Sequence, residues 1–211
     1  MLPLLHADAM DAIRGCLHLR GPAGACVAAL AAALGVLSAA QPATAQEISM
    51  RAERQGEFVV VSATVELQVE QRLAWDVLAD YDHLAEFIPD MQSSRVLARN
   101  ADGVIVEQKG EIGFLIFRQP VDVRLVVSEF PPQRIVARAI SGNLKEMEAR
   151  YELESSSAGV KISYFGRFIP DFLLPPVFGT ALVYNSLAKQ FRAMVAEIQR
   201  RDALARNRTK P

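Results

Sequence analysis

Apolar and polar residues alternate along several stretches of the chain, as in β-strands with one buried face. Along residues 58–69, Val61, Ala63 and Val65 occupy every second position, with Ser62 and Thr64 between them. Successive side chains of a strand point to opposite faces, so this spacing predicts a strand with one apolar face and one wet face.

Six further stretches have strand-like composition or alternation and are separated by turn residues. They cover residues 94–99, 103–111, 115–129, 134–141, 144–154 and 160–169. The breaks between them are rich in Gly, Pro, Asn, Asp and Ser, which favour turns. Because the connections are short, these strands are expected to be antiparallel neighbours in a meander.

The apolar period changes to that of a helix in two places. Leu73 and Val77, and likewise Trp75 and Leu78, follow the first strand at helical spacing, and Asp80 ends that helix. From Gly179 onward a longer helix carries one apolar stripe, formed by Val183, Leu187, Phe191, Met194, Val195 and Ile198.

An antiparallel sheet and one long helix bury their apolar faces against each other. We therefore predict an α+β fold in which a curved seven-stranded antiparallel sheet wraps around the C-terminal helix, with two short helices after the first strand. The space between sheet and helix could be a filled core or a ligand cavity, and the residue pattern favours neither.

The first 45 residues differ in composition from the rest. Arg14 and Arg20 precede an Ala-rich apolar run, and Ala43 and Ala45 supply the small-residue pattern that a signal peptidase reads. The alternative is a membrane anchor, but an Ala-rich run has weak transfer energy. We expect residues 1–45 to be a signal peptide cleaved near Ala45, which predicts a periplasmic or secreted protein.

The remaining chain is expected to form one domain. We assign residues 46–57 to an N-terminal lead-in, residues 58–203 to the folded domain and residues 204–211 to a frayed basic tail. The formal net charge is −1 at pH 7, whereas phosphate binding requires a basic face, so no nucleic-acid partner is expected. The sequence leaves the oligomeric state open.

Metal and redox chemistry have few candidate residues. Cys16 and Cys26 lie within the expected signal peptide, and His83 is the one histidine after it. Disulfides, thiolate nucleophiles and Cys/His zinc sites are therefore not expected, and no G-x-S-x-G nucleophile elbow occurs. We predict no metal site and no cofactor.

Several motifs resemble the START-like SRPBCC superfamily. They are the W-D-V-L helix, D-Y-D-H-L-A-E-F-I-P, S-S-R-V-L and E-F-P-P-Q-R-I, within a resemblance that covers about residues 58–200. The chain most resembles the branch that groups polyketide cyclase/dehydrases with coenzyme-Q-binding START-domain proteins. The resemblance implies the helix-grip fold, in which the sheet and the long C-terminal helix enclose a hydrophobic cavity.

The resemblance also implies that residues 78–91 lie over one mouth of the cavity. This segment contains four acidic residues together with Tyr81 and Phe87, which is more apolar surface than a solvated loop needs. We interpret the two rings as pointing into the cavity; the alternative is that both are ordinary core side chains.

Further ligand-binding candidates lie on the expected inner faces of the strands and the helix. A buried tyrosine hydroxyl or amide needs a polar partner, which a ligand can supply. The candidate ligand-binding residues are Tyr81, Phe87, Gln108, Phe117, Tyr151, Tyr164, Phe168 and Tyr184. Each could instead belong to a filled core. No catalytic residue is assigned, because no acid–base pair is evident.

The connection between the last strand and the long helix is unusually apolar. Residues 168–178, from Phe168 to Phe178, read FIPDFLLPPVF, and their three prolines prevent regular structure. An exposed segment of this kind would touch a membrane or admit a ligand, whereas the alternative is a segment packed onto its own domain. It is too short to span a bilayer.

These features together favour a binding protein for a hydrophobic small molecule, such as a lipid or an isoprenoid- or quinone-like ligand. The first alternative is a metal-free enzyme of the cyclase/dehydrase type that uses the same cavity. The second is a membrane-associated interaction module.

Overall fold

The computed structural model describes residues 47–114, 117–172 and 179–208, and the side chains of Phe114 and Phe117 lie outside this description. The strands are β1 (Ser49–Gln55), β2 (Phe58–Leu67), β3 (Met91–Asn100), β4 (Gly103–Phe114), β5 (Phe117–Phe130), β6 (Arg134–Gly142), β7 (Leu144–Ser156) and β8 (Gly159–Pro170). The helices are α1 (Gln71–Leu78), the 3-10 turn η1 (Tyr81–His83), α2 (Leu84–Phe87) and α3 (Gly179–Arg208).

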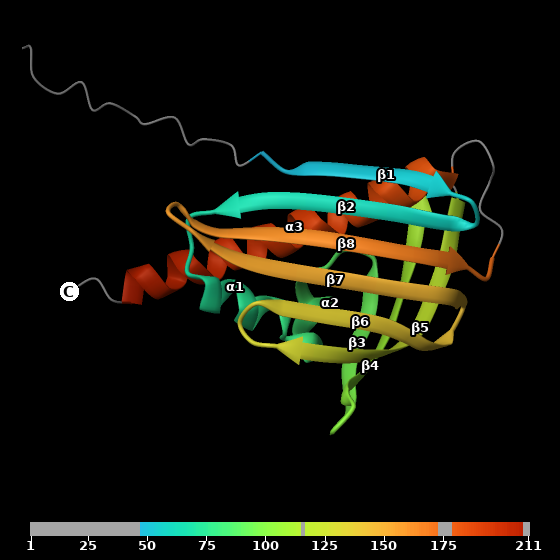
Figure 1. Ribbon diagram of the computed structural model, residues 1–211, viewed down its shortest axis with the longest axis horizontal. Coiled ribbons are helices and arrows are strands. Elements are labelled where there is room, and N and C mark those ends of the chain that lie inside the picture. Colours follow the sequence, from blue (N-terminus) through green and yellow to red (C-terminus); the bar gives the residue numbers. More distant parts are fainter. Residues whose placement is uncertain (1–46, 115–116, 173–178, 209–211) are drawn as a thin grey trace, which may run out of the picture. The chain divides into compact units, whose positions relative to one another are not determined.

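The strands form one antiparallel sheet in the order β1-β2-β8-β7-β6-β5-β4-β3. The meander from β3 to β8 agrees with the short connections, and β2 closes the arrangement by pairing with β8. The sheet curls around α3, because β4 and β5 turn away from the direction of β1, β2 and β8 (Figure 1). This is the predicted helix-grip arrangement of a sheet around a C-terminal helix.

The prediction of seven strands was wrong, because the sheet has eight. The additional strand is β1, which occupies most of the expected lead-in and pairs along its length with β2. It is an edge strand in which Met50 and Ala52 alone are half-buried, so it lacks the apolar alternation by which strands are recognised. The short helices α1 and α2 consequently follow the second strand instead of the first.

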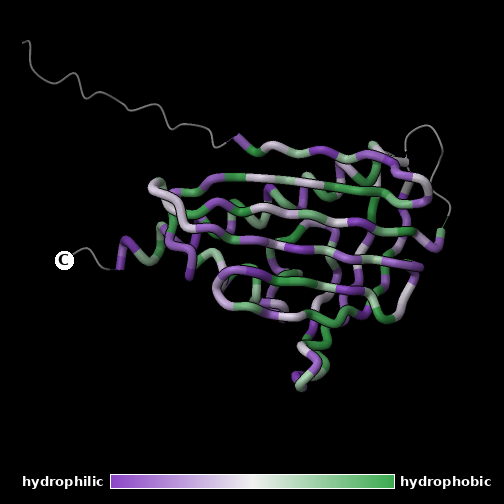
Figure 2. Tube along the Cα trace, viewed as in Figure 1, coloured by the Kyte–Doolittle hydropathy of each residue, from purple (hydrophilic) through white to green (hydrophobic). Residues whose placement is uncertain are grey.

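The inner face of the sheet is apolar and packs against α3. The alternation is visible along the strands as alternating green and purple segments (Figure 2). Val61, Val106 and Val160 on the sheet are almost fully buried, as are Leu182 and Ile198 on α3. The apolar stripe of α3 thus faces the sheet, as its period of 3.6 residues predicted.

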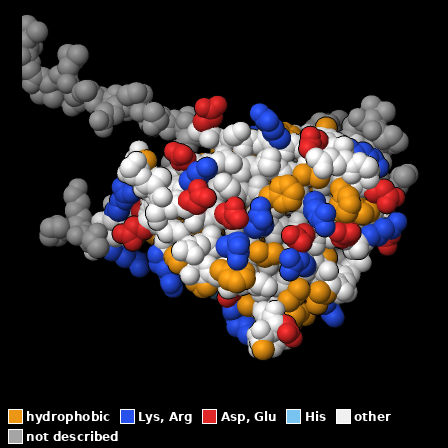
Figure 3. All heavy atoms as spheres, viewed as in Figure 1, with side chains coloured by type: hydrophobic (Ala, Val, Ile, Leu, Met, Phe, Trp, Pro, Cys, Tyr) orange, Lys and Arg blue, Asp and Glu red, His pale blue; other side chains and the backbone are white. Residues whose placement is uncertain are grey.

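The outer face of the sheet carries many charges, with basic and acidic side chains interspersed (Figure 3). Arg138 pairs with Glu148 at 3.1 Å and Arg167 with Glu146 at 3.0 Å, all from this face. The Glu107 side chain also lies on this face but is only 8% exposed, because Arg95 covers it at 2.6 Å. Charges of both signs are thus paired with each other across this face.

Some predictions concern residues outside the described ranges. These are the signal peptide at residues 1–45, the end of the basic tail at 209–211, the part of the apolar connection at 173–178, and the side chain of Phe117. Within the described ranges, no helix has both the length and the apolar character needed to cross a bilayer.

Candidate functional site

The centre of the inner sheet face is a cross-strand row of small residues. Gly166 of β8 pairs with Ala149 of β7, and Ala149 pairs with Ala137 of β6. Val61 and Val127 flank this row on β2 and β5. Because three adjacent strands contribute glycine or alanine at the same level, the sheet has a recess there that α3 does not fill.

The next row along the sheet contains two tyrosines. Tyr151 and Tyr164 are directly opposite each other on β7 and β8, with ring centroids 4.9 Å apart. The Tyr164 hydroxyl lies over Gly166, where any Cβ would overlap it. Burial raises the pKa of Tyr164 to about 12, and burial together with the neighbouring Tyr164 also raises the pKa of Tyr151. Both hydroxyls therefore stay protonated at neutral pH.

A cavity of about 180 Å³, the inner chamber, lies between this recess and the helices. Tyr81, Leu84 and Ile88 line it on one side, and Phe191 and Met194 of α3 on another. All of its lining residues are uncharged, and the other lining residues are Met50, Leu78, Met91, Val106, Gln108, Leu125, Val127, Ile135, Ala137, Met147, Ala149, Tyr151, Tyr164, Leu187 and Gln190. The structure thus contains a cavity and not a filled core at this position.

A second cavity of about 150 Å³, the outer chamber, adjoins the first. Six residues line both chambers: Met91, Gln108, Met147, Tyr164, Leu187 and Gln190. Phe168 and Phe172, at the end of β8, line the outer chamber together with Val183 of α3. The two chambers therefore lie next to each other along the inner face of the sheet.

Charged residues border only the outer chamber, and each of them has an opposite charge nearby. Asp90 accepts a hydrogen bond from Lys189 at 2.8 Å, and Glu111 is paired with Arg118. Lys109 pairs with Asp122 at 3.1 Å. No cluster of three or more His, Cys, Asp or Glu side chains that could hold a metal occurs among the residues described.

The segment formed by η1 and α2 closes the inner chamber. Tyr81 is 6% exposed, and its hydroxyl lies beside the carboxylate of Glu129, one oxygen of which is also buried. Burial, and after it the charge of Glu129, raise the pKa of Tyr81. The Glu129 carboxylate is therefore positioned to accept the hydrogen of the Tyr81 hydroxyl, which stays protonated.

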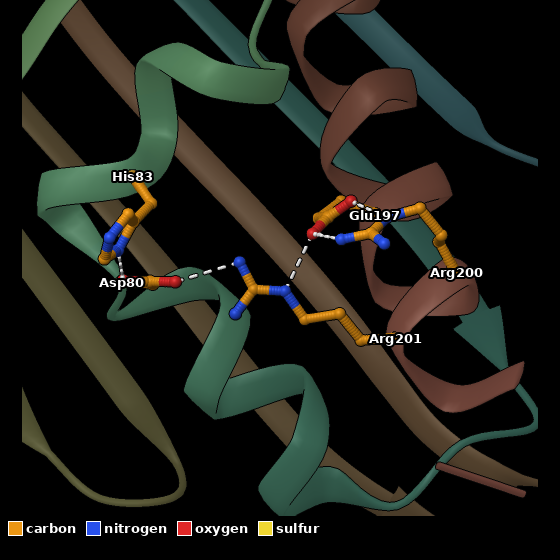
Figure 4. Close-up of polar contacts among 5 residues, drawn as sticks. All are labelled: Asp80, His83, Glu197, Arg200 and Arg201. Carbon is orange, nitrogen blue, oxygen red and sulfur yellow. Dashed lines mark hydrogen bonds and ion pairs between the residues drawn. The ribbon is translucent and has the colours of Figure 1, made fainter. Parts of the chain in front are cut away.

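An ion-pair cluster of Asp80, His83, Glu197, Arg200 and Arg201 attaches this segment to α3 (Figure 4). Arg201 donates to Asp80 at 2.9 Å and to Glu197 at 2.7 Å, and so bridges the two elements. His83 completes the cluster through its Nδ1, 2.6 Å from Asp80. Arg201 also lies over the ring of Phe87, with its Cζ 5.9 Å from the centroid.

The cluster favours the ionised carboxylates. Hydrogen bonds from Arg200 and then Arg201 lower the pKa of Glu197 to about 2. Burial opposes ionisation of Asp80, but hydrogen bonds from His83 and Arg201 outweigh it and keep the Asp80 pKa below its usual value. The Asp80 carboxylate in turn raises the pKa of His83.

The structure brings together five of the eight residues proposed from sequence as ligand contacts. Tyr81, Gln108, Tyr151, Tyr164 and Phe168 line the cavity. Phe87 and Tyr184 line neither chamber. Phe87 instead packs against Arg201. Tyr184 lies on α3 between the lining residues Val183 and Leu187. The eighth residue, Phe117, lies outside the described side chains.

Sequence reasoning missed Gln190, which lines both chambers. It lies three residues after Leu187 and four before Met194, and is therefore a polar residue within the apolar stripe of α3. A glutamine within an apolar helical stripe is the sequence feature that could have identified Gln190 as a cavity residue.

Replacing Gly166 with Ala is expected to displace the Tyr164 ring toward the inner chamber. The added Cβ would overlap the hydroxyl and lie 2.9 Å from Cζ, which predicts a loss of about 1–2 kcal/mol in the free energy of unfolding. Urea denaturation of Gly166→Ala, Tyr164→Phe and the double variant tests this. The double variant should be less destabilised than the sum of the single variants, because the overlapping oxygen is gone. Strict additivity would contradict the contact.

Comparisons with known proteins agree with this architecture. A family model described as polyketide cyclase / dehydrase and lipid transport matches residues 67–195. A START superfamily protein from Mycobacterium smegmatis is similar with a TM-score of 0.56 and 17% identity, over 67% of this chain and 97% of that chain. A search of curated proteins found no match.

Two further solved structures are similar over most of their length. A STAR-related lipid transfer protein from Xanthomonas axonopodis has a TM-score of 0.57 and 12% identity, over 72% of this chain and 93% of that chain. The Zhui aromatase/cyclase from a Streptomyces species has a TM-score of 0.54 and 16% identity, over 72% and 96%. At these identities the similarity establishes the fold alone.

Proposed function

The chain belongs to the polyketide cyclase/dehydrase and lipid transport family, and from this premise we propose that it binds a hydrophobic small molecule between the sheet and α3. A lipid or an isoprenoid- or quinone-like molecule would suit the elongated apolar space. The observation that carries the proposal is the pair of adjoining chambers of about 180 and 150 Å³.

Binding would depend mainly on removing apolar ligand surface from water. Each 100 Å² removed contributes about 2.5 kcal/mol, from which the cost of immobilising the ligand must be subtracted. A few polar groups in an otherwise apolar wall are typical of small-molecule sites, where they orient the ligand. Gln108, Tyr151 and Tyr164 have this role in the proposal.

Binding without chemistry is favoured over a cyclase or dehydrase reaction by the residues around the inner chamber. General acid–base catalysis requires a group whose pKa lies near the working pH. The titratable groups that line the inner chamber within the described residues are the tyrosines Tyr81, Tyr151 and Tyr164, and burial raises the pKa of each. They can donate hydrogen bonds but are poor proton-transfer groups at neutral pH.

We also propose that the protein is exported and acts in the periplasm or outside the cell. The N-terminal pattern of basic residues, an apolar run and a small-residue cleavage motif supports this. Contact with a membrane surface through residues 168–178 would place Phe168 and Phe172, which line the outer chamber, beside the bilayer.

Native mass spectrometry of the protein purified from its bacterial host tests both proposals. We expect a chain that begins at or near Gln46 and a non-covalent adduct that is lost under denaturing conditions. The Ala149→Trp variant, purified in parallel, should lack the adduct because the indole ring occupies the inner chamber. A protein that never carries an adduct and binds no added apolar probe would contradict the binding function, and a retained N-terminal segment would contradict export.

A further inference from the structure

The junction between the two chambers is lined by uncharged polar side chains from opposite layers of the fold. Gln108 projects from β4 and Gln190 from α3, and both line both chambers. Tyr164 of β8 is the third polar residue that lines both. We refer to Gln108, Tyr164 and Gln190 as the polar waist, because they lie where the two chambers adjoin and the other three residues that line both chambers are apolar.

The polar waist has unused hydrogen-bonding capacity. Gln108 donates one long hydrogen bond, from Nε2 to the Ser94 hydroxyl at 3.4 Å. The Gln190 amide and the Tyr164 hydroxyl form no hydrogen bond with the described residues, and both side chains line the cavity. A primary amide has two donor hydrogens and an acceptor oxygen, and leaving these unpaired in an apolar site is unfavourable. Core packing alone would be served better by leucine at both positions.

The distribution of charged residues around the cavity makes an ionised ligand group unfavourable at the polar waist. The inner chamber has no charged residue in its lining. Asp90, Lys109 and Glu111 border the outer chamber, and each is already within an ion pair. An ionised ligand group at the waist would lose its hydration without gaining a counter-ion, which is strongly unfavourable.

We propose that the polar waist is a specificity site for an uncharged ketone or hydroxyl oxygen in the middle of an otherwise apolar ligand. The two amides and the tyrosine hydroxyl hold this oxygen, and the apolar arms on either side of it occupy the two chambers. The proposal rests on the proposed binding function and adds the class of ligand: neutral, elongated and oxygenated near its centre, in preference to a plain hydrocarbon or an ionised fatty acid.

Competition for a bound fluorescent probe tests the polar waist. The neutral dye N-phenyl-1-naphthylamine reports occupancy, and the competitors are 6-undecanone, undecane and undecanoic acid at pH 7, which are matched in chain length. The proteins are the wild type, Gln190→Leu, Gln108→Leu and, as a control, Gln92→Leu, since the Gln92 side chain is exposed on β3. Circular-dichroism melting checks that each variant is folded. Two waist variants are used so that the test can still be made if one of them fails to fold.

The informative quantity is the ratio of the dissociation constants of undecane and 6-undecanone. Loss of one hydrogen bond to the ketone should lower this ratio about 3- to 10-fold in Gln190→Leu and in Gln108→Leu, with undecane binding unchanged or tighter. Gln92→Leu should leave the ratio at its wild-type value. In the wild type the acid should bind more weakly than the ketone.

The outcomes separate this proposal from the binding function. If the dye binds but both waist variants keep the wild-type ratio, the polar waist is overturned and the binding function stands. If undecanoate displaces the dye better than the ketone, the proposed exclusion of ionic groups is wrong. If neither the dye nor any competitor binds the wild type, both the waist and the binding function fail.

Discussion

Substitution of Ala149 with Trp is expected to abolish binding of an apolar probe while the domain remains folded. Ala149 lies in the row of small residues beneath the inner chamber and is 6% exposed. An indole ring buries roughly 150–250 Å², and the chamber of about 180 Å³ offers it space that no side chain occupies. The added ring would therefore replace the ligand without displacing core residues.

Stability and binding measured together distinguish a cavity from a tightly packed core. In a filled core the same substitution would cost about 1–3 kcal/mol or more. Here we expect a melting temperature within about 4 °C of the wild type, together with at least a 10-fold loss of N-phenyl-1-naphthylamine affinity. Ala196→Trp, at an exposed position of α3, is the control and should change neither quantity. Two results together would refute the cavity: a wild type that binds no probe, and an Ala149→Trp variant that melts at a far lower temperature.

Substitution of Glu197 with Gln is expected to lower the free energy of unfolding by about 1–2 kcal/mol at pH 7. Glu197 is 7% exposed and accepts hydrogen bonds from Arg200 at 2.6 Å and Arg201 at 2.7 Å. The glutamine removes the charge that both guanidinium groups pair with. Because Arg201 also binds Asp80, the attachment of η1 and α2 to α3 is weakened as well.

The difference in the free energy of unfolding between wild type and Glu197→Gln should increase as the pH rises. The pKa of Glu197 is lowered from 4.5 to about 2 in the folded protein. A lowered pKa stabilises the fold fully above the unfolded value, and this stabilisation is lost as the pH falls through the folded value. The two proteins should therefore differ most above pH 5 and converge toward pH 2 in urea denaturation.

Glu146→Gln is the matched control for this comparison. Glu146 pairs with Arg167 at 3.0 Å, but both side chains are more than two-fifths exposed, so the substitution should cost less than about 0.5 kcal/mol at any pH. Equal effects of the two substitutions would show that the ion-pair cluster contributes no more than an ordinary surface pair.

The sequence determined the identity of most elements because their signals are local. Strands such as β2 and β7 alternate along their own length, the others have strand-like composition between turn residues, and the stripe of α3 follows from residues three and four apart. The exception was β1, since an edge strand with exposed charges on both faces has no such alternation. Gln108, Tyr151, Tyr164 and Phe168 were identified in the same way, from their places on apolar faces, whereas Tyr81 was proposed from the family resemblance.

Only the tertiary structure decided that the apolar space is a cavity, because its shape depends on the register between strands. Gly166, Ala149 and Ala137 lie on three different strands. Nothing within any one of these strands indicates that the hydrogen-bonding register places the three residues side by side across the sheet. The same holds for Gln190, which lines the same chambers as Gln108 only because α3 packs against this part of the sheet. Phe87 shows the converse: the resemblance placed it over the cavity, but in the structure it packs against the core and beneath Arg201, which lies on a helix distant in sequence. Alternation fixes which face a side chain occupies, whereas long-range pairing fixes what lies opposite it.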